Sequence, residues 1–315
     1  MTSVEPVVLV RYSEIGVKLG RTRRLFEERL VRCIRCWLAE SGYTPRTRLI
    51  PGRVILEGLR SIQEALGAAA AAARAFGVHS AAAAYRLPND LDSLKTLIPS
   101  LFREALESAS SFAIRARRVE AYPVKSREVE RIVGAAVLEE VPRLRVDLEN
   151  PEVLIRLELR SRRAYAYLES WLVEGPGGLP YGVEGRAAVP LLECSLDELF
   201  AAWLAARRGA RLTLLGCREE ALELVEAWIP CGDATILEPR DPLAEAARLY
   251  RRMAALPVHA RVLRLPGGGY TLSPLAYAPQ GPIERLRRLF EEGLMSRAPR
   301  ALSSSRGSRG ATSPP

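Results

Sequence analysis

Residues 187–203 have the sequence AAVPLLECSLDELFAAW, which predicts an apolar strand, a tight loop and a helix. A strand that leads directly into a helix is a common phosphate site, because free backbone N–H groups and the helix dipole point at the loop. Such loops need glycine so that the backbone approaches the anion closely. This loop has no glycine, and the charges of Glu193 and Glu198 repel a polyphosphate. The framework of a nucleotide site is therefore predicted without its chemistry.

Strands and helices alternate after this point, which predicts a parallel α/β sheet. We expect a turn at Gly267–Gly269 and a disordered basic tail over 296–315, which is rich in Ser, Gly, Arg and Pro. The expected strands span 187–192, 211–215, 235–237 and 260–264, and the expected helices span 195–208, 218–228, 242–255 and 282–292.

The first half of the chain is expected to contain both strands and helices. The Gly- and Pro-rich stretch 175–182 ends it and predicts a linker. The expected strands span 7–11, two short pieces within 47–57, 78–87, 111–117, 153–159 and 163–168, and the expected helices span 21–40, 62–75, 91–108 and 126–139.

Composition is that of a soluble globular protein, with 48% hydrophobic and 26% charged residues. No apolar run is long enough to span a membrane, and the start lacks the features of a signal peptide, so we expect a cytoplasmic protein. The net charge is +9, and residues 1–60 hold 12 basic and 6 acidic groups. This local excess favours a polyanionic partner, nucleic acid above all, over a generic basic surface.

The five cysteines are odd in number and irregular in spacing, which argues against a disulfide framework. Cys33 and Cys36 share one face of the helix expected over 21–40. They are either a redox or metal pair or two half-buried small residues, and the second interpretation is favoured. His79 and His259 have no acidic or cysteine neighbours, so no metal site is expected.

Three sequence blocks occur in an order that points to a known family. The first is RYSEIGVK at 11–18, the second is SFAIRARR at 111–118, and the third is GPGGLP at 175–180, followed by Gly185-Arg186. Together they resemble the tRNA 4-thiouridine synthetase (tRNA sulfurtransferase) family over residues 7–186. The resemblance implies an α+β N-terminal half followed by a parallel-sheet α/β domain that is similar to a shortened ATP-pyrophosphatase domain.

The implied domains are a ferredoxin-like domain over 1–60 and a THUMP RNA-binding domain over 61–172. A Gly/Pro linker over 173–186 and a degenerate pyrophosphatase-loop domain over 187–295 follow, before the tail at 296–315.

The resemblance also implies that the THUMP region binds the acceptor end of tRNA. Guanidinium groups suit phosphate well. The alternative is that the surface arginines of this region pair with Glu120, Glu128 and Glu130. Tyr12 and Tyr122 are candidates for stacking on a base, although packed tyrosines are favoured. The predicted RNA-binding residues are Arg115, Arg117, Arg118, Lys125, Ser126 and Arg127, with Arg11, Lys18, Arg21, Arg23 and Arg24 extending the same basic face.

The third domain departs from the family pattern, which has Ser-Gly-Gly, an apolar residue, Asp and Ser after its first strand. The corresponding residues here are Glu193, Cys194, Ser195, Leu196, Asp197 and Glu198. Asp197 alone keeps its polar identity, so no catalytic residue is assigned, and Ser195 is expected to cap the helix. Cys217, at the end of a strand, is expected to be structural rather than a nucleophile.

We therefore expect a tRNA-binding pseudoenzyme that has lost ATP-dependent adenylation and needs no cofactor. One alternative is an active tRNA sulfurtransferase that uses ATP and Mg through an unusual loop. Another is a subunit that presents tRNA to a separate modification enzyme. A homodimer is left open by the resemblance.

Overall fold

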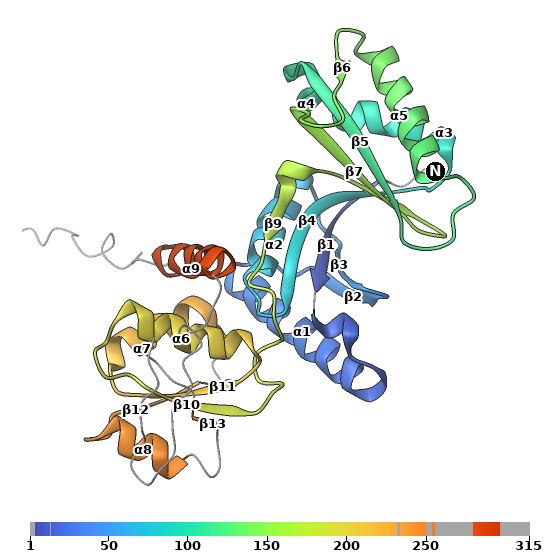
Figure 1. Cartoon of the computed structure of the whole chain (residues 1–315). Coiled ribbons are helices and arrows are strands. Elements are labelled where there is room, and N and C mark those ends of the chain that lie inside the picture. The colour runs from blue at the N-terminus through green and yellow to red at the C-terminus, as the bar shows by residue number, and fades with distance from the viewer. Residues whose placement is uncertain (1–3, 13, 232–233, 250–253, 256–279, 297–315) are drawn as a thin grey trace, which may run out of the picture. The chain divides into compact units, whose positions relative to one another are not determined.

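The computed structural model describes residues 4–12, 14–231, 234–249, 254–255 and 280–296, and it divides into two compact units (Figure 1). Unit 1 comprises Met1–Val183 with Arg207–Gly209, and unit 2 comprises Glu184–Ala206 with Ala210–Pro315. None of the helices in the described ranges has the length and apolar character needed to cross a bilayer.

Unit 1 begins with the βαββαβ order expected of a ferredoxin-like domain, paired antiparallel in the strand order β2-β3-β1-β4. The side chain of Ser61 accepts a hydrogen bond from the backbone N–H of Glu64 at 3.1 Å and so begins the second helix. The elements are β1 (Glu5–Tyr12), η1 (Glu14–Val17), α1 (Gly20–Glu40), β2 (Arg46–Ile50), β3 (Arg53–Glu57), α2 (Ile62–Ala73) and β4 (Val78–Leu87).

The same sheet continues in the order β4-β8-β7-β5-β6, and β9 pairs with β4. The prediction of one helix over 91–108 was wrong, because Phe102 leaves the helical conformation and packs its ring 5.5 Å from that of Trp171. The elements are α3 (Leu91–Leu101), α4 (Arg103–Ser108), β5 (Ser111–Arg118), α5 (Ser126–Glu140), β6 (Arg145–Val146), β7 (Val153–Leu159), β8 (Ala164–Leu168), η2 (Glu169–Trp171) and β9 (Leu172–Glu174).

The helices of unit 1 cover one face of this sheet. Val8 and Val10 of β1 pack against α1 and α2, and Leu157 of β7 packs in the core with α3 and α5. Because side chains alternate along a strand, residues of the other parity lie on the opposite face. There Val7 and Leu9 form a small apolar cluster with Tyr165 and Tyr167, among others. We call this second face, which carries the charged residues described below, the open face.

The Gly/Pro-rich stretch predicted as a linker is buried from Gly175 to Tyr181. A Cβ on Gly175 would lie 2.4 Å from the carbonyl oxygen of Val78, and a Cβ on Gly178 would lie 2.2 Å from that of Arg207. The glycines that suggest a flexible linker in the sequence thus allow close backbone packing within unit 1.

Unit 2 is a parallel sheet with the strand order β12-β11-β10-β13. Helices α6, α7 and α9 lie on one side of it and α8 on the other (Figure 1). The elements are β10 (Arg186–Pro190), α6 (Leu196–Arg207), β11 (Arg211–Leu215), α7 (Arg218–Trp228), β12 (Thr235–Leu237), α8 (Pro242–Leu249), β13 (Ala254–Ala255) and α9 (Gln280–Met295).

The predicted helix over 242–255 was wrong at its C-terminal end, because Ala254 and Ala255 pair as a strand with Ala187 and Ala188. The strand expected over 260–264, the turn at Gly267–Gly269 and residues 297–315 of the expected tail lie outside the described residues.

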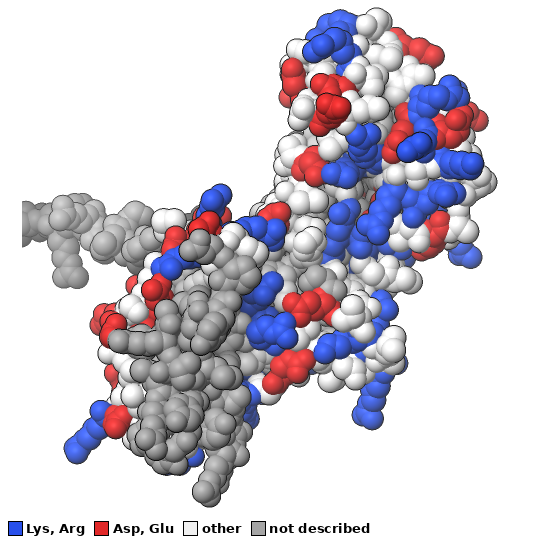
Figure 2. Space-filling view, in the orientation of Figure 1, with Lys and Arg blue, Asp and Glu red and all other residues white. Residues whose placement is uncertain are grey.

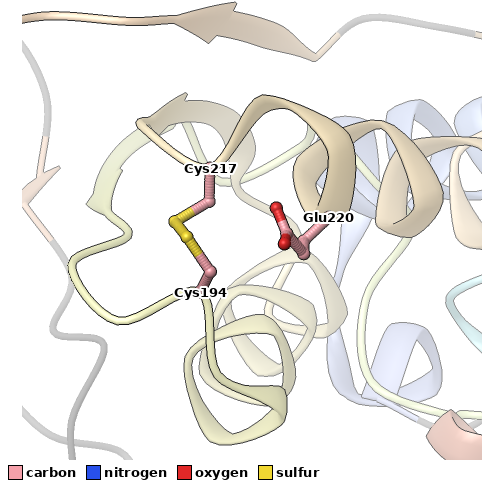
Figure 3. Close-up of side chains that lie close together, drawn as sticks. All are labelled: Cys194, Cys217 and Glu220. Carbon is pink, nitrogen blue, oxygen red and sulfur yellow. A yellow bond between two sulfur atoms is a disulfide. The ribbon is translucent and has the colours of Figure 1, made fainter.

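The expectation of no disulfide was also wrong. Cys194 and Cys217 are bonded, with their Cα atoms 5.4 Å apart. The two cysteines are separated by 23 positions, but each follows one of two neighbouring parallel strands, β10 and β11, whose ends lie at one edge of the sheet (Figure 3). Cys33 forms no disulfide with Cys36 and packs half-buried against the helix-covered core.

Candidate functional site

Strand β5 carries two of the predicted RNA-binding arginines to the open face. Arg115 lies opposite Arg156, and Arg117 lies opposite Glu158, in the parallel pairing of β5 with β7. Arg117 is exposed, while the Arg115 guanidinium donates to the backbone carbonyl of Leu148. Arg118 has the opposite parity and is exposed on the other face. Alternation along the strand therefore separates Arg118 from the first two.

The end of β5 leads into the N-terminus of α5. Lys125 is the N-cap residue, and its side chain makes no capping hydrogen bond. Ser126 is the first helical residue, and Lys125 and Arg127 are exposed. The first N–H groups of a helix attract anions, and two adjacent cations add to that attraction. This end of α5 is suited to a phosphate group.

The carboxylates considered as partners of the surface arginines contact other groups. Glu120 binds Arg160 at 3.0 Å, and Glu130 accepts from the backbone N–H of Ala116 at 2.8 Å. Glu128 binds Arg131, whose hydrogen bond lowers the pKa of this carboxyl. Among the described residues, none of these three carboxylates forms an ion pair with an arginine of β5.

The predicted RNA-binding cations of α1 and of the loop before it lie apart from Arg115 and Arg117. Lys18 lies over the ring of Phe26, with its Nζ 5.3 Å from the ring centre. Arg21 is exposed, and Arg23 and Arg24 each bind a glutamate one turn later, at 2.9 and 3.0 Å. Since α1 covers the face opposite the open face, the structure does not bring these residues together with Arg115 and Arg117.

Arg11 is the one member of the predicted N-terminal set that lies on the open face. Its guanidinium donates to the Tyr167 hydroxyl and lies 4.0 Å from the Glu158 carboxylate. Burial raises the pKa of Tyr167. Tyr12 and Tyr122 are both buried, so the packed interpretation of these two tyrosines is confirmed.

Sequence reasoning missed two buried glutamates on the open face. Glu57 binds Arg46 at 3.0 Å, Arg48 at 2.8 Å and Arg86 at 2.5 Å. Burial alone would raise the pKa of Glu57, but Arg48, Arg86 and Arg46 outweigh it and lower the pKa.

The second buried glutamate, Glu158, is surrounded in the same way. It binds Arg53 and Arg160, each at 2.9 Å, in addition to its contact with Arg11. The sequence contained one signal for these charged groups. Charged residues at every second position of a strand, such as Arg46 and Arg48, lie on the same face of the sheet. In Figure 2, Lys and Arg side chains gather over the part of unit 1 that holds the sheet and the THUMP-region strands.

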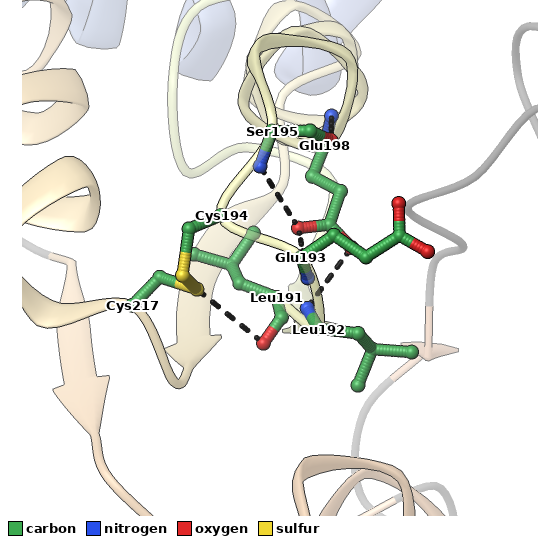
Figure 4. Close-up of a disulfide and its surroundings, with 7 residues drawn as sticks. All are labelled: Leu191, Leu192, Glu193, Cys194, Ser195, Glu198 and Cys217. Carbon is green, nitrogen blue, oxygen red and sulfur yellow. Dashed lines mark hydrogen bonds between the residues drawn. A yellow bond between two sulfur atoms is a disulfide. The ribbon is translucent and has the colours of Figure 1, made fainter.

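The loop between β10 and α6 is closed by a side chain of its own helix. The Glu198 carboxylate accepts from the backbone N–H of Leu192 at 2.9 Å, of Glu193 at 3.0 Å and of Ser195 at 3.4 Å (Figure 4). Ser195 Oγ in turn accepts from the N–H of Glu198 at 3.4 Å, which completes a capping box. Glu198 is fully buried. The expected cap by Ser195 is confirmed, and the larger contribution comes from Glu198.

The other predicted residues of this loop point elsewhere. Cys194 has a backbone φ of 52°, a conformation that favours glycine, at a position where the related family has glycine. Asp197 binds Arg287 of α9 at 2.6 Å. Glu193 is exposed.

Potential metal ligands gather at one place in the described residues. Sulfur atoms of Cys194 and Cys217 and a carboxylate oxygen of Glu220 lie within 4.8 Å of one another (Figure 3). Zinc binds cysteine as thiolate, whereas these sulfur atoms are bonded to each other. The arrangement as it stands is a covalent link between two loops.

Two family models match the first half of the chain. The ThiI ferredoxin-like domain matches residues 7–82, and the THUMP domain matches residues 88–169. The first match extends beyond residue 60, so it includes α2 and the first half of β4. A probable tRNA sulfurtransferase of Aeropyrum pernix is 39% identical over 209 residues, which are 66% of this chain and 51% of that protein. The chain is a THUMP-domain protein of the tRNA sulfurtransferase family.

Other members of this family match over a similar extent. The tRNA sulfurtransferase of Pyrobaculum aerophilum is 34% identical over 254 residues, which are 77% of this chain and 50% of that protein. The chain thus spans about half the length of the curated relatives it matches.

Two solved structures support the fold. PH1313 from Pyrococcus horikoshii matches with a TM-score of 0.70 and 25% identity, over 91% of this chain and 99% of that one. A 4-thiouridine synthetase, solved as an RNA complex with bound ATP, matches with a TM-score of 0.58 and 22% identity, over 79% of this chain and 68% of that one. The fold of the family is therefore present, including a parallel-sheet α/β domain after the THUMP domain.

Proposed function

We propose that the protein binds tRNA at its acceptor end through the THUMP domain. The observation that carries this proposal is a set of cations near the C-terminal end of β5: Arg115 and Arg117 on the open face, and Lys125 and Arg127 at the start of α5, which packs against the opposite face. The carboxylates nearest in sequence bind other partners, so these cations are available to phosphate. Guanidinium forks and helix N–H groups are the donors that phosphates prefer.

The expected mode of recognition is by shape and phosphate contacts, because structured RNA presents its backbone and 2′-hydroxyls rather than readable base edges. The solved 4-thiouridine synthetase was crystallised with RNA, and its shared fold supports RNA as the ligand class here. Arg11 extends the same face toward the ferredoxin-like strands.

We also propose that unit 2 does not adenylate tRNA, so that the protein is a pseudoenzyme. Three backbone N–H groups of the loop that leads into α6 are donors that a bound phosphate would use, and the buried carboxylate of Glu198 accepts from all three. An entering polyphosphate would have to displace this anion, and Glu193 adds a second negative charge beside it. The residues present therefore do not fit ATP.

The RNA proposal is tested by measuring tRNA binding to the full chain by fluorescence anisotropy between 50 and 300 mM salt. Each neutralised phosphate contributes about −0.7 to −0.9 to the slope of log affinity against log salt. We expect Arg115→Ala/Arg117→Ala to reduce the slope by about 2. Arg218→Ala/Arg248→Ala removes two exposed cations of unit 2 and is the matched control. Equal slopes for all three proteins would contradict the proposal.

The ATP proposal is tested by equilibrium dialysis with labelled ATP and Mg, and by ATP–pyrophosphate exchange with and without tRNA. We expect neither binding nor exchange by the wild-type chain. Exchange at a rate that depends on protein concentration would overturn the pseudoenzyme assignment and support an active sulfurtransferase.

A further inference from the structure

A cavity of about 600 Å³ opens on the open face of unit 1. Strand β2 contributes Arg46, Thr47 and Arg48, strands β3 and β4 contribute Glu57 and Arg86, and the turn between β7 and β8 contributes Arg162 and Arg163. None of these lining residues belongs to the predicted RNA-binding set. The cavity lies within one compact unit, so its shape does not depend on the placement of unit 2.

The charge of the lining is strongly unbalanced. Its five guanidinium groups face the single carboxylate of Glu57. Glu5 lies beside the lining and binds Arg86, which still leaves an excess of positive charge. Arginine stays protonated at all physiological pH values, so this excess cannot be relieved by loss of a proton.

Glu57 fixes three of these arginines in place. Its side chain is 3% exposed and binds Arg46, Arg48 and Arg86 together. Arg46 is 79% exposed and Arg48 48% exposed, so their guanidinium groups reach solvent while one side is held. Donors held in this way lose less conformational freedom when an anion binds.

The remaining two arginines have no such partner. Arg162 and Arg163 are exposed, and among the described residues no carboxylate forms an ion pair with either. Arg163 donates only to the backbone carbonyl of Arg162, at 3.2 Å. Two unpaired cations at the rim of a cavity that is already positive indicate an anionic ligand from outside the chain.

We propose that this cavity binds a phosphate group and that the phosphate belongs to the backbone of the bound RNA. This proposal rests on the proposed tRNA binding. The sheet register gives the reason: Arg86 lies opposite Tyr165, Tyr165 opposite Glu158, and Glu158 opposite Arg117. Strands are about 4.8 Å apart, so one row places Arg86 about 14 Å from Arg117 on the same face. One RNA strand spans that separation within a few nucleotides.

The test compares the wild-type chain with Arg162→Ala/Arg163→Ala and with Arg46→Ala in the tRNA titration across salt. All three substituted side chains are exposed, and none lies in the core. We expect roughly tenfold weaker tRNA binding for the double variant at low salt, and a salt slope reduced by 1 to 2. Arg46→Ala should show a smaller change of the same sign. Arg218→Ala/Arg248→Ala again serves as the control for lost positive charge.

A second arm separates RNA from free phosphate as the source. The melting temperature of wild-type protein and the Arg162→Ala/Arg163→Ala variant is measured with millimolar inorganic phosphate. Stabilisation of the wild type by phosphate, with tRNA affinity equal in both proteins, would overturn RNA as the source. Strong tRNA binding with identical salt slopes would overturn the cavity proposal alone. No tRNA binding by the wild type would instead overturn the proposed function.

Discussion

Two strand-to-helix junctions of the molecule have the same architecture and opposite chemistry. At the junction of β5 and α5, no side chain caps the helix, and Lys125 and Arg127 are exposed at its start. At the junction of β10 and α6, Glu198 accepts three backbone N–H groups and Cys194 is bonded to Cys217. One junction leaves its donors to an outside anion, while the other satisfies them internally.

This difference shows that one or two side chains determine whether a strand-to-helix junction leaves its N–H groups available to a phosphate. The free N–H groups and the helix dipole are common to both junctions. At the β10–α6 junction, a carboxylate at the third helical position reaches back to the loop. It accepts the hydrogen bonds that an external phosphate would otherwise accept. Under the proposed function, the α/β fold of unit 2 is kept as structure, and anion binding belongs to the THUMP domain.

The disulfide of the β10–α6 junction gives the largest expected effect. Replacing the disulfide by Cys194→Ser/Cys217→Ser should reduce the free energy of opening unit 2 by about 3 kcal/mol, because a 23-residue connection is no longer closed. Hydrogen exchange measured by mass spectrometry over residues 186–228 reports the change locally. Cys33→Ser, in unit 1, is the control. A loss below about 1 kcal/mol would show that the loop is held by Glu198 alone.

The charge of the α5 junction gives the next effect. Lys125→Glu/Arg127→Glu makes this helix start resemble that of α6, and we expect tRNA affinity to fall roughly 100-fold at low salt, since two attractions become repulsions. Anisotropy titrations with tRNA measure the loss. Arg21→Glu/Arg24→Glu reverses two exposed cations on α1, which packs in the ferredoxin-like part of unit 1. An equal loss in both variants would mean that the start of α5 has no particular role in RNA binding.

Sequence reasoning placed most elements correctly where patterns were local. Strands 78–87, 153–159 and 211–215 and helix 218–228 agree with the structure to the residue, because alternation and periodicity are properties of neighbouring positions. The Ser195 cap was predictable for the same reason. The disulfide was not, because it depends on β10 and β11 being adjacent in the sheet.

The two glutamate-centred arginine groups were also beyond local patterns. Glu57 and Arg86 are far apart in sequence and meet only through the register of β3, β1 and β4. The role of Glu198 was predictable from the sequence only in part. The Ser-x-x-Glu spacing of a capping box was visible from the sequence, but burial of the carboxylate depends on packing of the whole domain.

Loss of the charge of the Glu198 carboxylate should have a smaller effect. Glu198→Gln keeps the shape but leaves one acceptor oxygen for three N–H groups, and a buried unsatisfied donor costs roughly 1 to 3 kcal/mol. We expect unit 2 to lose about 2 kcal/mol of stability in urea unfolding, with tRNA affinity unchanged. Ser126→Ala at the start of α5 is the matched change, and it should cost little because no side chain caps that helix. Equal losses at the two junctions would contradict the contrast drawn between them.

Asp197 should give the smallest effect, although it is the one polar residue of the loop shared with the family pattern. Its carboxylate binds Arg287 at 2.6 Å, with the two side chains 50% and 40% exposed. Exposed ion pairs contribute about 0.2 to 1 kcal/mol. Asp197→Asn and Arg287→Ala should therefore each change stability by less than about 1 kcal/mol, and a double-mutant cycle should give a coupling of similar size. Because the loop already binds its own carboxylate, Asp197→Asn should leave tRNA affinity and the absence of ATP exchange unaltered. If Asp197→Asn instead weakened ATP binding detected with the wild-type chain, the loop would still be a nucleotide site and the two junctions would differ less than their contacts indicate.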